Sequence, residues 1–143
     1  MTEQWIQGRR VVRIMFRDGL VLNLDDFNEL VISVPMELTV PAVTGGMSPE
    51  VFRIDPMAVL REQKPLFDFA GETCTHADWD EDGSLHLRFS GGHGIDVHSD
   101  DTHTSWELYG KHHGYAACLP HGHVRVIRHD LPEPAGADAP ASG

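Results

Sequence analysis

Apolar and polar residues alternate in three short runs between Gly71 and His98, in the segment GETCTHADWDEDGSLHLRFSGGHGIDVH. Turn-forming residues bound each run, as in the stretches DEDG and SGGHG. Alternation of this kind is typical of β-strands that bury one face and expose the other. The segment is therefore predicted to form a three-stranded antiparallel meander.

A second segment with the same pattern lies upstream, between Gly8 and Val34. When it is advanced by 65 positions, five of its apolar residues fall on apolar residues downstream. The matched pairs are Leu20 and Leu85, Leu22 and Leu87, Leu24 and Phe89, Leu30 and Ile95, and Ile32 and Val97. Gly8 falls on Gly71 at an offset of 63, because the first turn downstream is two residues longer. We therefore predict an internal repeat with copies at about 8–34 and 71–98.

The apolar positions also predict how the strands pair. In the first copy Phe16 is expected opposite Leu20 and Val12 opposite Leu24, with Gly19 in the connecting loop. In the second copy the expected pairs are Trp79 with Leu85, Ala77 with Leu87, Leu87 with Val97, and Phe89 with Ile95. The intervening residues of each strand are then on the outer face.

The rest of the chain predicts one helix and a C-terminal hairpin. Asp55 and Pro56 suit the start of a helix, so a short helix is expected near 56–64, packed through Met57 and Leu60. Further strands are expected over residues 106–110, 115–119 and 123–127. The composition from residue 131 onward is rich in Pro, Ala and Gly, which predicts a disordered tail over 131–143.

Together these elements predict a mainly β protein with a single domain over residues 1–130. The two duplicated meanders must cover each other's apolar faces, and the C-terminal hairpin adds to them. A small sandwich or a partly closed barrel is therefore the expected fold.

The charge of the chain restricts its partners. It has 22 Asp and Glu but 11 Lys and Arg, which gives a net charge of -11 at pH 7. Nucleic acids and anionic membranes need positively charged surfaces, so neither is expected as a partner, whereas a basic partner would be attracted. No apolar leader, long apolar run or paired-cysteine motif is found, so a cytoplasmic location is expected. No phosphate-binding loop or nucleophile motif is present, and no cofactor is expected.

Ten histidines are the main chemical feature of the sequence. The predicted pairing places two polar rows on the outer face of the second meander, Asp78–His86–His98 and His76–Arg88–Asp96. Two histidines and a carboxylate are the ligands of a facial metal triad, so the first row is a candidate site for a divalent transition metal. A flat row is a poor cage, and the alternative is a solvated face with an Arg88–Asp96 pair. The equivalent positions of the first copy are uncharged: Val21, Asn23, Val31 and Ser33.

A second candidate surface is formed by aromatic residues of the C-terminal part. Trp106 and Tyr109 are either core residues or one wall of a binding groove, with Glu107 pointing the other way. His121 and His123 flank the turn residue Gly122, which favours exposed histidines over a metal pair.

The stretches EDGSLHLRF, SWELYG and CLPHGH resemble a family of small uncharacterised bacterial proteins, classed together as a domain of unknown function. The resemblance covers about 120 residues. It implies a compact, mostly β domain, and it implies no activity or catalytic residue.

Two functions are consistent with the sequence. The first is a non-enzymatic module that binds a protein or a small molecule, because the chain is acidic, has a small β scaffold and lacks a catalytic motif. The alternative is a metal-binding protein or metal-dependent enzyme that uses the histidines of the second meander.

Overall fold

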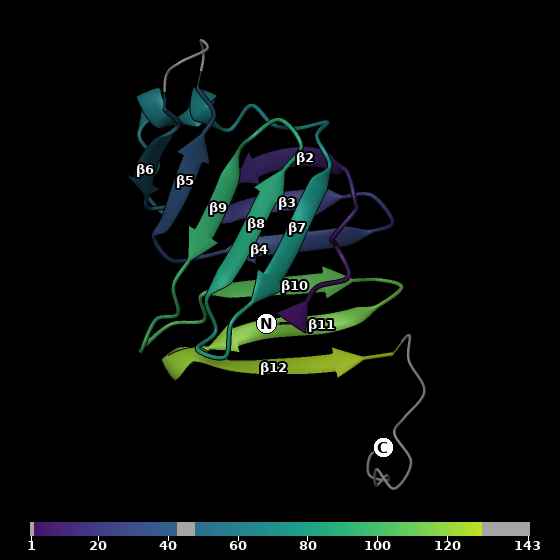
Figure 1. Cartoon of the computed structure of the whole chain (residues 1–143). Helices are drawn as coiled ribbons and strands as arrows, with labels where there is room; N and C mark the ends of the chain where they lie inside the picture. The colour runs from purple at the N-terminus through teal and green to yellow at the C-terminus, as the bar shows by residue number, and fades with distance from the viewer. Residues whose placement is uncertain (1, 43–47, 130–143) are drawn as a thin grey trace, which may run out of the picture.

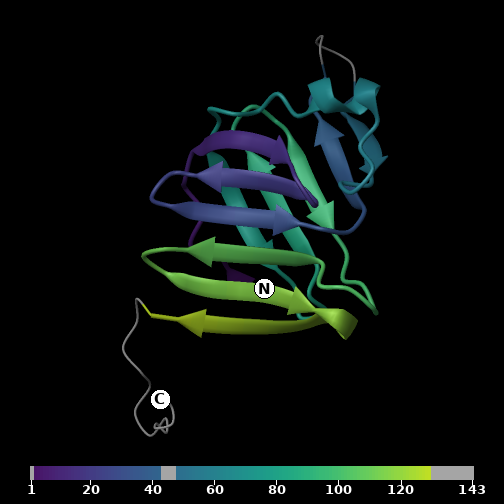
Figure 2. The ribbon, with the colours of Figure 1, turned by 180° about the vertical axis from the view of Figure 1, so that it is seen from behind.

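The computed structural model describes residues 2–42 and 48–129, which form two antiparallel sheets packed face to face (Figure 1). The strands of one sheet run across those of the other, and Figure 2 shows the same sandwich from behind. The predicted mainly β fold is confirmed as a sandwich, since no ladder of the described strands closes the sheets into a barrel. The predicted tail, 131–143, lies outside the described residues.

Each sheet has six strands. Sheet I has the order β12-β11-β10-β4-β3-β2 and consists of β2 (Val11–Phe16), β3 (Leu20–Leu24), β4 (Asn28–Ile32), β10 (Trp106–Gly110), β11 (Gly114–Leu119) and β12 (His123–Arg128). Sheet II has the order β1-β7-β8-β9-β5-β6 and consists of β1 (Thr2–Glu3), β7 (Cys74–Trp79), β8 (Leu85–Phe89), β9 (Gly94–Val97), β5 (Met36–Val40) and β6 (Glu50–Ile54). Two 3-10 segments, η1 (Arg61–Leu66) and η2 (Pro120–Gly122), complete the described elements. None of the helical segments in these ranges has the length and apolar character needed to cross a bilayer.

The two meanders pair residue for residue at the offsets found in the sequence. In sheet I the pairs include Phe16 with Leu20, Ile14 with Leu22 and Leu22 with Leu30. In sheet II the corresponding pairs are Trp79 with Leu85, Ala77 with Leu87 and Leu87 with Ile95. Even the register shift recurs, between Val11 and Arg13 in one copy and between Cys74 and His76 in the other. The duplicated meanders therefore share one backbone plan.

The strands that follow each meander cross to the opposite sheet. The β5–β6 hairpin pairs with β9 of the second copy, and the β10–β11 hairpin pairs with β4 of the first copy. The registers again correspond: Leu38 lies opposite Ile95 and Phe52, and Leu108 lies opposite Leu30 and Ala116. The repeat thus extends to five strands, with the last two exchanged between copies. Because each sheet contains strands from both copies, the halves are interlocked.

Equivalent residues of the two copies also meet where the chain enters each meander. Arg10 and Thr73, which are equivalent at the offset of 63, form an isolated bridge with one another. Around it the backbone hydrogen bonds come in matched pairs. The Gly8 N–H donates to the Cys74 carbonyl and the Gly71 N–H to the Val11 carbonyl, both at 2.7 Å. Such reciprocal bonds indicate a local two-fold pseudo-symmetry between the repeats.

The core lies between the sheets and is built from the predicted inward positions. Leu20, Leu22, Leu85, Leu87 and Ile95 are all buried. Its centre also contains the ring contact between Trp79 and Trp106, with centroids 5.3 Å apart. Both cysteines are buried and free, and burial raises the pKa of Cys74 to about 12.

The short helix predicted near 56–64 is present in another form, because it starts later and is a 3-10 helix. In this part of the chain the structure has the short 3-10 helix η1, and Pro65 lies inside it. The Asp55 side chain does form a hydrogen bond to the backbone, in which its Oδ1 accepts from the Met57 N–H at 3.0 Å. This bond closes a turn and does not start an α-helix. Met57 and Leu60 are 57% and 56% exposed, so no apolar face anchors a helix here.

Two details of the predicted pairing are wrong. The bulge in β2 places Val11, instead of Val12, opposite Leu24. In the second copy Leu87 pairs with Ile95, which is two residues from the predicted partner Val97. A shift of two residues keeps every side chain on its face, so the apolar pattern cannot distinguish the two registers.

The turn decides the register of β8 and β9. The Phe89 N–H donates to the His93 carbonyl at 2.9 Å, which leaves residues 90–92 as a three-residue loop. Gly92 in this loop has a φ of 108°, a conformation in which glycine is favoured.

Candidate functional sites

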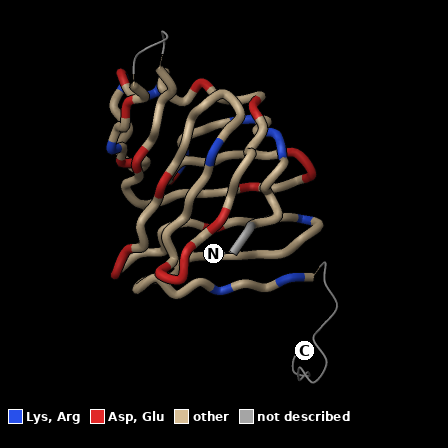
Figure 3. The backbone as a smooth tube through the Cα atoms, in the orientation of Figure 1, with Lys and Arg blue, Asp and Glu red and all other residues tan. Residues whose placement is uncertain are grey.

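The outer face of sheet II carries a continuous polar row. The backbone pairing places the following residues side by side across four strands: Asp78, His86, Asp96 and Glu37. These positions alternate with buried apolar residues along β8 and β9, so His86 and Asp96 point away from the core. Figure 3 shows acidic residues on this sheet and in the turn between β7 and β8. The strand register therefore gathers three acidic residues and a histidine on one face.

His86 lies at the centre of this row and contacts a carboxylate on each side. Its Nδ1 is 2.7 Å from Asp96 Oδ1, and its Nε2 is 2.8 Å from Asp80 Oδ2. Partial burial alone lowers the pKa of His86, but the bonds to Asp96 and Asp80 outweigh it, and the pKa is raised. Arg88 Nη2 also donates to Asp96 Oδ1 at 3.2 Å. Asp96 therefore contacts both His86 and Arg88.

Asp78 is unusual among the carboxylates because it is only 2% exposed. Its Oδ2 is bonded to His76 Nε2, whereas its Oδ1 has no hydrogen-bond partner among the described residues. One ligand atom each from Asp78, Asp80 and His86 lie within 4.8 Å of one another. We call these three residues the sheet II cluster. A buried carboxylate, a half-exposed carboxylate and an imidazole are thus held together on one face.

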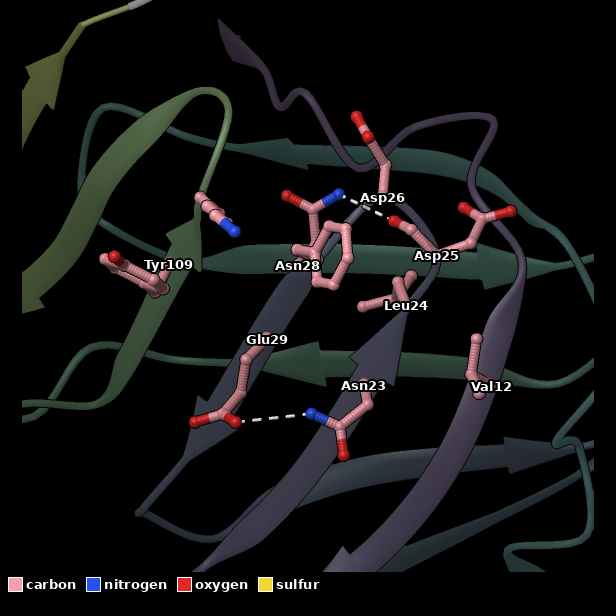
Figure 4. A pocket seen from close by; sticks show the side chains of 10 residues that line it. Val12, Asn23, Leu24, Asp25, Asp26, Asn28, Glu29 and Tyr109 are labelled. Atoms are coloured by element: carbon pink, nitrogen blue, oxygen red, sulfur yellow. Dashed lines mark hydrogen bonds between the residues drawn. The ribbon is translucent and has the colours of Figure 1, made fainter.

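Sheet I has a cavity on its own outer face, at the end where β3 turns into β4 (Figure 4). Its volume is about 620 Å³, within the range of small-ligand sites. The lining residues are Val12, Asn23, Leu24, Asp25, Asp26, Phe27, Asn28, Glu29, Tyr109 and Lys111. Val12 on β2 and Tyr109 on β10 lie on opposite sides of it, with β3 and β4 between them. The cavity thus spans four strands of sheet I.

Exposed apolar side chains gather at this cavity. Phe27, Val12 and Tyr109 are 68%, 54% and 54% exposed, and all three line it. The Lys111 ammonium lies 5.0 Å from the centre of the Phe27 ring, a cation–π arrangement. The ring of Phe27 therefore already offers one face to a positive charge.

Phe27 has an unfavourable backbone conformation. Its φ is 60° and that of the preceding Asp26 is 67°, both in the left-handed region that non-glycine residues avoid. At the equivalent position of the second copy, 65 residues on, the chain has Gly92. Backbone strain of this kind tends to occur at functional positions. The first copy thus keeps a large exposed aromatic ring at a position where glycine would fit better.

Asp25 and Asp26 line the cavity and hold the turn through hydrogen bonds and ion pairs. The Oδ2 atom of Asp26 lies 3.4 Å from Arg9 Nη2 and 3.3 Å from His113 Nε2. Asp25 accepts from the Arg10 N–H at 3.2 Å, and its backbone carbonyl accepts from the Asn28 amide at 2.9 Å. The turn is therefore well anchored despite its strained φ angles.

Comparison with known proteins identifies the family of this chain. The model of a family of unknown function, DUF6188, matches residues 2–128. The chain belongs to DUF6188. The resemblance to a domain of unknown function is thus confirmed, and the family carries no assigned activity. No curated protein and no solved structure matches the chain.

In this DUF6188 chain, the predicted metal row is only partly assembled. Asp78 lies opposite His86, as expected, but His98 falls beyond the end of β9 and is exposed. Asp96 takes the place beside His86 that was predicted for His98, because the register differs by two residues. His98 is absent from the sheet II cluster, in which Asp80 is the third member.

Asp80 could not be identified by strand alternation, because it belongs to the turn after β7. The Asp80 N–H donates to the Ser84 carbonyl at 2.9 Å, and its own carbonyl accepts from the Gly83 N–H at 3.0 Å. This turn brings the carboxylate back toward His86. The DWDEDG sequence is the signal, since it places a carboxylate directly after the strand that carries Asp78.

The second polar row is also changed. His76 lies opposite Arg88 as predicted, but Arg88 is paired in the backbone with Gly94 instead of Asp96. The predicted ion pair between Arg88 and Asp96 is nevertheless present, because the long arginine side chain reaches diagonally across the strands.

Of the two aromatic candidates, Trp106 lies in the core and Tyr109 lies on the surface. Trp106 is fully buried, and its indole N–H donates to the Gly83 carbonyl at 2.9 Å, so it is a core residue. Tyr109 is exposed at the cavity. Glu107 shares the outer face with Tyr109, contrary to the expected groove, and accepts from the Tyr115 hydroxyl at 2.7 Å.

Proposed function

We propose that this protein is a non-enzymatic binding module that recognises a basic, partly apolar segment of a partner protein through the cavity on sheet I. The observation that carries the proposal is Phe27. A large aromatic side chain is held exposed, in a costly left-handed conformation, at the position where the second copy has Gly92. Strain of about 1–2 kcal/mol at such a residue is expected to be retained only if the ring has a use.

The charge around the cavity supports a basic ligand. Asp25, Asp26 and Glu29 line it, and Lys111 supplies the positive charge among its lining residues. The net charge of -11 adds long-range attraction for a cationic partner. Phe27 and Tyr109 supply aromatic surface, on which both apolar side chains and cations pack well. A basic side chain next to an apolar one is the ligand that satisfies both features.

Isotope-labelled protein titrated with a pair of synthetic peptides tests this function. One peptide has lysines on both sides of a phenylalanine, and its matched partner has glutamates in the same places. The basic peptide is expected to shift the amide resonances of residues 23–29 and 107–111, whereas the acidic peptide leaves them unchanged. Phe27→Ser and Tyr109→Ala are each expected to weaken binding by about tenfold, as for aromatic hot spots.

Val51→Ala is the matched control, because Val51 is another exposed apolar residue but lies on β6 of sheet II. Its affinity for the basic peptide should equal that of the unchanged protein. Equal shifts with both peptides, or full binding by Phe27→Ser, would overturn the proposal.

A further inference from the structure

We propose that the sheet II cluster binds one divalent transition-metal ion, with Asp78, Asp80 and His86 as its protein ligands. This site lies on the outer face of sheet II, so it is separate from the cavity on sheet I and goes beyond the binding function proposed above. Its members come from β7, from the turn that follows β7, and from β8.

The distances suit a single ion. One ligand atom from each of the three residues lies within 4.8 Å of the other two. Atoms that bind an ion at about 2.1 Å are themselves about 3–4 Å apart, so small side-chain rotations complete the site. The strands fix two of the ligands, because Asp78 and His86 lie directly opposite one another in the β7–β8 ladder.

The buried oxygen of Asp78 gives an independent reason for a cation. Asp78 is 2% exposed, and its Oδ1 has no hydrogen-bond partner among the described residues. A buried polar group without a partner destabilises the folded protein, and a charged one does so more strongly. The carboxylate of Asp80 increases this destabilisation, because a ligand oxygen of Asp80 and one of Asp78 lie within 4.8 Å of each other. A bound cation would both coordinate this oxygen and neutralise the repulsion.

The surroundings also orient the ligands in the way that metal sites require. Asp96 Oδ1 lies 2.7 Å from His86 Nδ1. With an ion bound, this carboxylate would accept the Nδ1 proton in a hydrogen bond, and the Nε2 lone pair would be directed at the ion. Nε2 now contacts Asp80, and the ion would take a place between them. His76 contacts the second oxygen of Asp78 and fixes that carboxylate in the same manner. Ligand-supporting carboxylates and histidines of this kind are a regular part of metal sites.

The donor set selects the class of metal. One imidazole nitrogen and two carboxylates suit manganese, iron, cobalt or zinc, and they suit neither copper(I), which prefers sulfur, nor all-oxygen magnesium and calcium sites. Solvent molecules would complete the coordination, since Asp80 and His86 are partly exposed.

The test is a cobalt(II) titration of the full chain without a histidine tag, after dialysis against a chelator. Calorimetry gives the affinity and stoichiometry, and the visible absorption of cobalt reports its ligands. One ion per chain is expected. Asp80→Asn and Asp96→Asn are expected to weaken binding about 10–100-fold, the range found for ligands and for the groups that orient them. Both carboxylates are at least partly exposed, so these variants should fold.

The matched control is His98→Ala, which removes the histidine that strand alternation alone assigned to the site. Cobalt affinity should be unchanged in this variant, and also in His121→Ala, whose side chain is largely exposed in another loop. Absence of cobalt binding by the unchanged protein, or equal weakening by His98→Ala and Asp80→Asn, would overturn the proposal. Unchanged affinity in both aspartate variants would do the same.

Discussion

The central outer positions of the two meanders differ in their chemistry, although the backbones pair in the same way. Three central positions show this most clearly. The equivalent residues are Met15 and Asp78, Val21 and His86, and Val31 and Asp96. In sheet I this row is apolar, whereas in sheet II it is charged and hydrogen-bonded.

The inner faces, in contrast, remain alike. Leu22 and Leu87 are equivalent and both buried, and so are Leu30 and Ile95. Packing between the sheets constrains the inner residues, because a change of volume there costs free energy directly. The outer residues carry no such restraint, so the copies could acquire different surface chemistry on one scaffold. Functional residues of this fold should therefore be sought on the outer faces.

The largest expected effect comes from moving one residue of the charged row into the apolar row. Val21→His copies His86 into sheet I, where Val21 is 2% exposed between Met15 and Val31. The imidazole would lack both carboxylate partners there. The free energy of unfolding, measured by urea denaturation, should fall by about 2–4 kcal/mol.

Asn23→Arg is the control for that substitution. It copies Arg88 onto the same strand, at a partly exposed position beside Glu29. Its free energy of unfolding should change by less than about 0.5 kcal/mol, as is usual at the surface. If Val21→His is as stable as Asn23→Arg, the apolar row is not a buried structural feature.

The reverse exchange should be stabilising. The triple variant Asp78→Met, His86→Val and Asp96→Val gives sheet II the row of sheet I. It removes a buried carboxylate with an unpartnered oxygen, and replacement of buried ionic groups by apolar residues often stabilises by about 1–4 kcal/mol. Urea denaturation of metal-free protein should show a gain of about 1–3 kcal/mol. A loss of stability would instead make the charged row part of the structural framework.

The alternation of apolar residues predicted the strands of the two meanders, the repeat and which side of each of these strands is buried, because a period of two is a local property of the sequence. It did not predict β1 or β6. It failed where a turn decides the structure. Whether Leu87 pairs with Val97 or with Ile95 depends on the loop at 90–92. Both registers put the same residues on the same face, so the apolar pattern does not distinguish them. This one register shift replaced His98 by Asp96 beside His86.

The exchange of strands between the sheets was also beyond sequence reasoning. The β5–β6 and β10–β11 hairpins have similar apolar patterns, so local periodicity does not tell which sheet each one joins. The cavity on sheet I escaped prediction for a related reason. It depends on the strained turn at Phe27, whose left-handed conformation is atypical of phenylalanine.

The turns of the two meanders allow a third prediction. Phe27→Gly gives the first copy the residue of the second, Gly92, and relieves the left-handed strain. The ring contact with Lys111 is lost, so the net gain in the free energy of unfolding should be about 0.5–1 kcal/mol. Val51→Gly, at an exposed position of an ordinary strand, should instead lose about 0.5–1 kcal/mol. A loss of stability in Phe27→Gly would mean that the ring stabilises the turn, and that strain is no sign of function there.

The smallest effect concerns the two crossings between the sheets. The first copy crosses through Ser33, Val34 and Pro35, whereas the second uses the longer loop 98–105. In that loop Asp100 accepts hydrogen bonds from the Thr102 N–H at 2.9 Å, from the Thr102 hydroxyl, and from the backbone and ring of His103. These bonds, led by the one from the Thr102 backbone, lower the pKa of Asp100 to about 2.

A carboxyl whose pKa is lower in the folded state contributes stability above its unfolded pKa, and this contribution is lost as the pH falls through the folded pKa. For Asp100 the window runs from the ordinary pKa of 3.8 down to about 2. Asp100→Asn should therefore melt at a lower temperature than the unchanged protein at about pH 6, and the difference should shrink toward pH 2. Asp101→Asn is the matched control, because it removes one carboxylate from the same loop at a largely exposed position. If the difference between Asp100→Asn and the unchanged protein stays constant across this window, the bonds of Asp100 do not order the crossing loop, and the longer crossing is stabilised by other contacts.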